Sequence, residues 1–354
     1  MEETIKVQVQ RLKDYCEQIL IKANLRQEEA QAVADNLVDA NVMGVDSHGV
    51  TRLADYLSRL EEGIIESETN LVVEKETTTT ALFNANNGWG QYASRKAMEM
   101  AIEKAKMHGC AIVGVKNSNH YGTASYYTRM AAEAGCLGIA MSNASPLMVS
   151  WGAKSPTLGT NPLSIAVPTN QHPAILDMAT STVARGKINL AAKNGKDIPE
   201  GWAINEEGEP TTDAQEALKG FLLPFGAKGS GLAMMIDIMT GVMTGALFGE
   251  SIPRMYDDPQ PQQLGHLFII FDIGAFMDIN EFKDRMDDRI KQTIESPPSK
   301  GFDQVFMPGD IEQSIRSKRL QEGIPLSSAI YKELQQLGEK YGVKMEDLRQ
   351  EAVN

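Results

Sequence analysis

A long, mostly apolar stretch, residues 231–249, limits what this chain can fold into more than any other feature. It reads GLAMMIDIMTGVMTGALFG and is nearly long enough to cross a lipid bilayer as a helix. Asp237 lies near its middle and no basic cluster flanks it, so we expect a long buried helix of a soluble protein and no membrane span. Gly241, Gly245 and Gly249 recur every four residues, which predicts a helix face that another helix or a subunit could approach closely.

The overall charge excludes some partners. It is −13, from 34 basic and 47 acidic side chains. Nucleic acids and anionic membranes are bound through fields of Lys and Arg, so neither is expected as a partner. Cys16, Cys110 and Cys136 are odd in number and form no Cys-x-x-Cys pair, which predicts free thiols in a reducing compartment. The first residues lack a signal-peptide pattern, so we expect a cytoplasmic protein.

Hydrophobic spacing divides the chain into three parts. Residues 1–70 have helical spacing and predict an N-terminal helical module. Residues 71–290 alternate between helix and strand patterns, which predicts a mixed α/β domain that holds cofactor and substrate and includes the apolar helix. Residues 291–354 return to a charged helical pattern, and we expect them to pack back on the N-terminal module.

Within these parts the periodicity predicts individual elements. Helices are expected at 4–23, 28–43, 53–60, 91–108 and 123–134, and strands at 71–73, 81–83, 111–115, 137–141, 164–167 and 174–176.

The two common nucleotide-binding loops are absent from the sequence. No Gly-x-Gly-x-x-Gly follows a predicted strand, and no Gly-x-x-x-x-Gly-Lys-Ser/Thr is present. The nearest feature is the run of glycines at 226–231, just before the apolar helix. Backbone N–H groups there, with Lys228 beside them, could hold a phosphate, and a simple turn into the helix explains the run equally well.

Among five histidines, none has metal-ligand spacing, so no metal site is expected. His120 differs in context, because it lies between a predicted strand and the start of a predicted helix. The positive end of the helix dipole would disfavour the protonated ring and keep a neutral proton acceptor. A capping or turn histidine remains an open alternative.

A second cluster, Asp-Ser-His-Gly-Val-Thr-Arg, covers residues 46–52. Ser47 could cap the third helix, and Arg52 and Tyr56 would then share one helix face. The planar fork of an Arg side chain matches a carboxylate in a bidentate manner, as a site for a small organic acid requires. An alternative interpretation, an N-cap residue followed by an Arg that faces solvent, explains the cluster equally well.

Together these segments resemble the malate/L-lactate dehydrogenase family, which includes ureidoglycolate dehydrogenases. The resemblance implies a nicotinamide-dependent oxidoreductase whose cofactor domain is not a Rossmann fold but a mixed, largely antiparallel sheet flanked by helices. It also implies a homodimer with the site near the subunit interface. The motifs that carry it, in chain order, are DSHG at 46–49 with Arg52, NSNHYG at 117–122, LGTNPL at 158–163, LDMATS at 176–181, IPEGW at 198–202, KG at 228–229 and PGD at 308–310.

The resemblance assigns roles to single residues. His120 is implied as the proton acceptor for a substrate hydroxyl, and His48, Arg52 and Tyr56 as the substrate end, with Arg52 on the carboxylate. Ala144 stands where relatives have Ser, and Asp310 where many have Glu. The stretches implied to contact the cofactor contain Ala144, Asn161, Asp177, Met178, Ala179, Lys228, Gly229, Gly309, Asp310 and Ile311.

Two segments, 254–258 and 301–309, look most like ureidoglycolate dehydrogenases, whereas 117–120 looks more like the malate and lactate members. We therefore expect oxidation of (S)-ureidoglycolate to oxalurate, in purine nitrogen catabolism, with NAD as cofactor and NADP left open. Malate or L-lactate oxidation, reduction of a cyclic imino acid, and non-catalytic binding of a small molecule remain alternatives.

Overall fold

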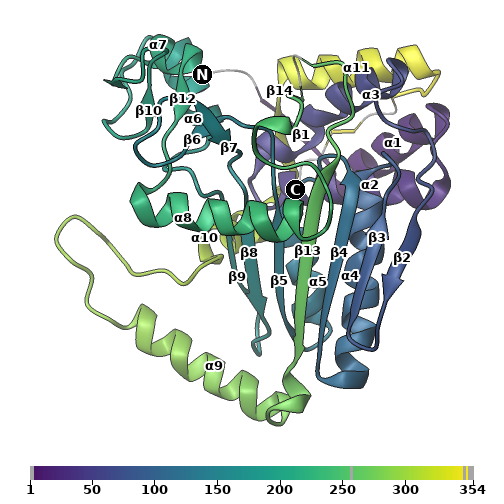
Figure 1. Ribbon diagram of the computed structural model, residues 1–354, viewed down its shortest axis with the longest axis vertical. Coiled ribbons are helices and arrows are strands. Elements are labelled where there is room, and N and C mark those ends of the chain that lie inside the picture. The colour runs from purple at the N-terminus through teal and green to yellow at the C-terminus, as the bar shows by residue number, and fades with distance from the viewer. Residues whose placement is uncertain (1–3, 256–257, 346–347, 350–354) are drawn as a thin grey trace.

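The computed structural model describes residues 4–255, 258–345 and 348–349. Its centre is a seven-stranded sheet in the order β2-β3-β4-β13-β5-β8-β9 (Figure 1). Of the strand pairs in this sheet, β3 and β4 run parallel and the others antiparallel. The expected mixed, largely antiparallel sheet is confirmed. Its strands are β2 (Val72–Glu76), β3 (Thr80–Asn84), β4 (Cys110–Ser118), β5 (Cys136–Ser142), β8 (Leu163–Val167), β9 (Ala174–Met178) and β13 (Leu264–Asp272).

Helices cover both faces of the sheet. α4 (Gly90–His108) and α5 (Ala124–Glu133) pack on one face, and α8 (Gly226–Asp237) packs on the other (Figure 1). The central strand β13 therefore buries apolar side chains in both directions: Phe268 and Ile270 contact the α4 and α5 side, and Leu267 contacts the α8 side. Burial on both faces explains why β13 reads as a continuous apolar run and shows no alternation.

The two ends of the chain meet beside the sheet. α1 (Val9–Lys22), α2 (Gln27–Val42) and α3 (Leu53–Glu61) form a helical cluster, and α11 (Ser328–Tyr341) lies against α1 and α3 (Figure 1). β1 (Thr4–Val7) pairs antiparallel with β14 (Ile324–Ser327). The prediction that the first helix begins at residue 4 was therefore wrong. Helical spacing within a segment cannot show that β14 pairs with these residues as a strand.

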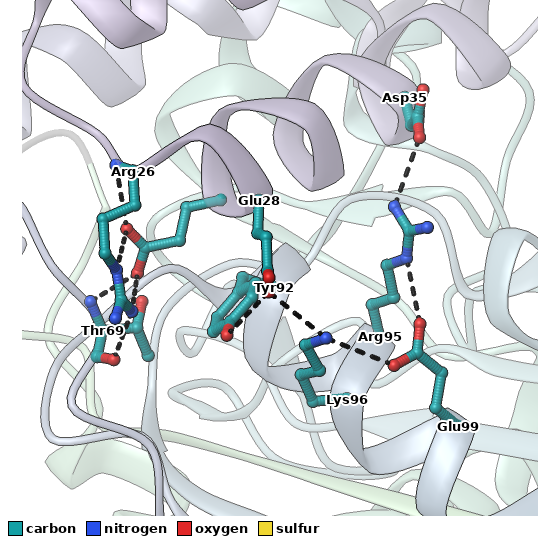
Figure 2. A network of polar contacts seen from close by, with 9 residues as sticks. Arg26, Glu28, Asp35, Thr69, Tyr92, Arg95, Lys96 and Glu99 are labelled. Atoms are coloured by element: carbon teal, nitrogen blue, oxygen red, sulfur yellow. Dashed lines mark hydrogen bonds and ion pairs between the residues drawn. The ribbon is translucent and has the colours of Figure 1, made fainter.

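Polar side chains link α2 to α4 (Figure 2). The Arg95 guanidinium lies 3.3 Å from the Asp35 carboxylate, and the Lys96 ammonium lies 3.4 Å from Glu28. Beside α2, Arg26 donates to the Thr69 carbonyl at 2.8 Å. These pairs are partly exposed, so each contributes little energy, and their effect is to orient α2 on the sheet domain.

A smaller sheet, β11-β10-β12-β6-β7, lies near the start of α8, which follows its strand β12 in the chain. It contains β6 (Met148–Val149), β7 (Pro156–Leu158), β10 (Ala203–Ile204), β11 (Pro210–Thr211) and β12 (Phe221–Leu222), together with α6 (Arg185–Lys193) and α7 (Ala214–Lys219). The remaining helices are α9 (Ile279–Ile294), which extends away from the body in Figure 1, and α10 (Asp310–Glu322).

The apolar stretch at 231–249 differs from its prediction. α8 begins at Gly226, ends at Asp237 and continues as a short π-helix to Val242. Gly245 and Gly249 adopt φ of +79° and +54°, so they lie in turns after the helix and not on one helix face. The expected long buried helix is also wrong in its burial, because one side faces outward: Met235, Val242 and Met243 are 51%, 51% and 59% exposed. In the described ranges, no helix is long and apolar enough to span a bilayer.

Candidate active site

The site is built where β4 and β5 end at the same edge of the sheet, on either side of the start of β13. His266 of β13 connects the two ends: its Nε2 lies 2.9 Å from the Ser118 hydroxyl and its Nδ1 2.9 Å from the Ser142 hydroxyl. Burial lowers the pKa of His266 to about 3, so the ring is neutral at physiological pH. Tyr121 stacks on the ring with the centroids 4.5 Å apart. No local pattern in the sequence predicts this bridge.

His120 follows β4 directly, and its ring is held through one nitrogen. The Tyr56 hydroxyl lies 2.7 Å from Nδ1, and the Gly122 N–H points at the same atom from 3.3 Å. Nε2 is therefore the ring nitrogen available to a reactant. Burial, followed by the nearby His48 and Arg52, holds the pKa of His120 well below its usual value. The ring is neutral, as a proton acceptor must be, and burial is the largest cause of this.

His48 lies beside His120, with the two rings stacked at a centroid distance of 5.6 Å. The Ser47 hydroxyl lies 3.0 Å from its Nδ1. Burial and, to a lesser extent, Arg52 lower the pKa of His48 to about 4. Two neutral imidazoles therefore lie beside the guanidinium of Arg52.

Arg52 immediately precedes α3. Its Nε donates to the Ser47 carbonyl at 2.7 Å, and its guanidinium lies 3.3 Å from the Asp55 carboxylate. Two short 3₁₀ turns occupy 46–48 and 50–52, and α3 begins at Leu53, so the prediction that Ser47 caps this helix was wrong. Its carbonyl instead fixes the arginine.

The turn that carries His48 is supported by α2 and α10. The Asn41 amide donates to Asp46 at 2.6 Å and accepts from the Val50 N–H at 2.8 Å. Arg319 of α10 contacts both oxygens of Asp46, at 2.6 and 3.0 Å. A Cβ at Gly49 would lie 2.2 Å from the Asn41 side chain, so glycine is required there. Sequence reasoning missed Asn41 and Arg319, since neither belongs to a motif.

The residues expected on the cofactor side fall into two groups. In the first, the buried Asn161 accepts from the Ala144 N–H at 3.1 Å and donates to the Ala233 carbonyl at 3.0 Å. Both ends of its amide are thus used within the protein, where they join the turn after β5 to α8. Gly229 packs under the Phe225 ring, which a Cβ would approach to 2.7 Å. Lys228 is exposed in the first turn of α8.

The second group follows β9 and the start of α10. The Asp177 carboxylate accepts from the Ser125 N–H at 2.9 Å, and the Ile175 N–H donates to the Pro308 carbonyl at 3.1 Å. Gly309 adopts φ +93°, and a Cβ there would lie 2.9 Å from the Ile175 carbonyl oxygen. Further members of the group, all at least partly exposed, are Met178, Ala179, Asp310 and Ile311.

These two groups fit an anionic dinucleotide. α8 begins without a side-chain cap on its N-cap residue, so backbone N–H groups of its first turn remain for phosphate oxygens. α10 also lacks such a cap, but Asp310 and Glu312 make its first turn acidic, so the phosphates are expected at α8. Lys228 adds a cation at the start of α8, and the bare backbone at Gly309 permits close approach. Over the described ranges, no three His, Cys, Asp or Glu side chains are grouped so as to hold a metal ion.

Comparisons with known proteins agree with this chemistry. A sequence model described as malate/L-lactate dehydrogenase matches residues 7–335. The malate/(S)-sulfolactate dehydrogenase of Methanothermus fervidus is 40% identical over 328 residues, which cover 92% of this chain and 95% of that protein. The ureidoglycolate dehydrogenase (NAD(+)) of Escherichia coli is 35% identical, with 93% and 95% covered. The solved sulfolactate dehydrogenase from Methanocaldococcus jannaschii has a TM-score of 0.91 at 36% identity, with 97% and 99% covered.

Proposed function

Because the chain belongs to the malate/L-lactate dehydrogenase family and is a hydroxy acid dehydrogenase, we propose that it oxidises malate or sulfolactate with NAD. Both are small 2-hydroxy acids that carry a second anionic group. The observation that carries the proposal is the arrangement of His120. The protein holds one ring nitrogen and leaves the other to the substrate, beside the guanidinium of Arg52.

In the proposed reaction, Arg52 binds the C1 carboxylate, and Nε2 of His120 accepts the C2 hydroxyl proton. The C2–H bond breaks with its electron pair leaving as hydride, and the C2–O bond becomes a carbonyl. When bound, the nicotinamide supplies the hydride acceptor. The neutral state of His48 avoids a second positive charge beside His120, which would weaken it as a base.

Cofactor binding is assigned to the two groups described above. Lys228 and the first turn of α8 would bind phosphate oxygens. The turn at Gly309 would place the backbone at the start of α10 in contact with the cofactor. Asn161 acts by fixing the position of Ala144 and α8.

Ureidoglycolate is the second candidate substrate. It is favoured by the two segments that look most like ureidoglycolate dehydrogenases and by the 35% identical relative of that name. Of the first segment, Tyr256 and Asp257 lie outside the described residues. In the second, Phe302 and Phe306 are 69% and 46% exposed, and their contribution to a site would come from an assembled dimer.

The test is a panel of substrates, each assayed with NAD and with NADP, in which near-UV absorbance monitors the reduction or oxidation of the cofactor. The substrates are malate, sulfolactate, ureidoglycolate, lactate and a cyclic imino acid. Malate or sulfolactate with NAD should give the highest kcat/KM. Reduction of the imino acid alone would identify an imine reductase, and no turnover with any compound would identify a non-catalytic binding protein. His120→Asn should lower kcat by roughly 10²-fold, whereas His108→Asn, at an exposed position, should not.

We also propose that the chain forms a homodimer. The outward side of α8 and the turn after it expose Met235, Val242 and Met243, and α9 has no buried residue along its length. Such apolar surfaces are covered in stable proteins, and a second copy offers the same surfaces in return. Light scattering should show a dimer that Met235→Glu combined with Val242→Glu converts to monomer. Met107→Glu, on the exposed side of α4, is the control.

A further inference from the structure

The two neighbours of His120 Nδ1 differ in what they can do. The backbone N–H of Gly122, 3.3 Å away, can only donate a hydrogen bond. The Tyr56 hydroxyl, 2.7 Å away, can donate or accept. Tyr56 is therefore the neighbour that can serve as partner to Nδ1 when this nitrogen carries a proton.

The proposed reaction requires a protonated Nδ1. A neutral imidazole carries one proton, so Nε2 can accept the substrate proton only while Nδ1 holds the ring's own. After the transfer both nitrogens are protonated. The Gly122 N–H opposes each of these states, because it directs a second hydrogen at Nδ1, whereas an accepting hydroxyl oxygen stabilises them.

We propose that Tyr56 is a positioning residue whose hydroxyl oxygen accepts a hydrogen bond from Nδ1–H of His120 and thereby presents Nε2 as the proton acceptor. This inference rests on the function proposed above. It assigns Tyr56 a role through His120 in place of a direct contact with substrate.

Packing holds Tyr56 in position for this role. The side chain is 2% exposed, and its ring meets the Trp89 ring edge-on at 6.2 Å. When the hydroxyl accepts from Nδ1, its own hydrogen needs another acceptor. Asn119 Oδ1 is buried, has no hydrogen-bond partner among the described residues, and lines the same small cavity as Tyr56 and His120. The cavity therefore contains an acceptor that no described residue satisfies, and the Gln91 side chain, which also lines it, is a further hydrogen-bond partner of the Tyr56 hydroxyl.

The other charged and titratable groups around His120 disfavour a positive ring. Among the described residues, Arg59 lines the same cavity as His120. Three further groups are His48, stacked on it, Arg52 before α3, and His266 of β13. All three lower the pKa of His120, after burial as the largest cause. Among the contacts of His120 with described residues, the one with Tyr56 can compensate for them, so its loss should change the pH dependence of the reaction and not merely its rate.

Tyr56→Phe tests this, since it removes the hydroxyl and keeps the ring. We expect kcat for oxidation to fall by roughly tenfold or more. The acid limb of the profile of kcat/KM against pH should move to lower pH by about one unit, because the protonated ring has lost its acceptor. KM for NAD should stay unchanged. The control is Tyr15→Phe. The buried Tyr15 hydroxyl donates to the Leu334 carbonyl at 3.0 Å in another part of the molecule, so the pH profile of this variant should match the wild type.

A Tyr56→Phe enzyme whose acid limb stays in place would overturn the proposal, even with reduced kcat, because it would show a structural role only. A second measurement does not depend on activity or on the folding of Tyr56→Phe. In ¹⁵N NMR of the wild-type protein, with His120 assigned by comparison with His120→Asn, neutral His120 should carry its proton on Nδ1. A proton on Nε2 would refute the positioning role. Absence of turnover with every hydroxy acid, with Nδ1 protonated, would instead count against the proposed function alone.

Discussion

The buried histidine that joins β4 to β5 makes the stability of this protein depend on pH. His266 is fully buried, and burial lowers its pKa from 6.5 to about 3. In the unfolded chain the ring regains its ordinary pKa, so below pH 6.5 the unfolded state binds a proton that the folded state does not. The stabilisation is complete above pH 6.5 and is lost as the pH falls from there toward 3.

The size of the effect follows from the two pKa values. Between pH 7 and pH 5 the unfolded state takes up about 0.7 of a proton at His266 and the folded state almost none. This lowers the free energy of unfolding by roughly 2 kcal/mol. If the pH could be lowered to 3, the loss from this one residue would reach about 4 kcal/mol, a large part of the stability of an ordinary domain.

The assay is urea unfolding followed by tryptophan fluorescence, at pH 7 and at pH 5, for the wild type and for His266→Gln. Glutamine does not titrate, so the loss on acidification should be about 2 kcal/mol smaller in the variant, whatever its stability at pH 7. His108→Gln makes the same replacement at the exposed end of α4 and should lose as much as the wild type. Equal losses in wild type and His266→Gln would refute the reasoning.

Three further predictions concern single positions. Arg52→Lys should raise KM for the hydroxy acid at least about tenfold, because a point charge does not replace a planar fork. Unchanged kcat and KM in steady-state assays would show that Arg52 does not bind the carboxylate. Lys228→Ala should raise KM for NAD with little change in kcat, more strongly at low salt, and a KM independent of ionic strength would contradict its phosphate role. Gly122→Ala should cost at least about 2 kcal/mol in urea unfolding, since φ is +81° and its Cβ would lie 1.6 Å from the buried Asn36 amide oxygen. A midpoint equal to the wild type would show that the turn can shift.

Local patterns located most of the predicted elements correctly. The helices expected at 28–43, 91–108 and 123–134 and the strand expected at 137–141 all lie within two residues of their predicted ends. Each is encoded by spacing along its own segment and by a glycine or a turn at its end. The order of the short motifs was sufficient to identify the family, since side chains that meet one substrate and one cofactor are constrained in type and sequence context.

The sequence by itself thus determined the fold class, the family and the identity of His120 and Arg52 as candidate site residues. Tertiary structure decided which groups act on them. Tyr56 meets His120 across 64 residues, and Ser118 meets His266 across 148, and no local pattern records such partners. It also decided where α8 ends and which side of it faces outward, because the apolar run that looked like one buried helix is divided between the sheet and an exposed surface. Periodicity describes one segment at a time, whereas burial, hydrogen-bond partners and pKa values depend on what the folded chain brings beside it.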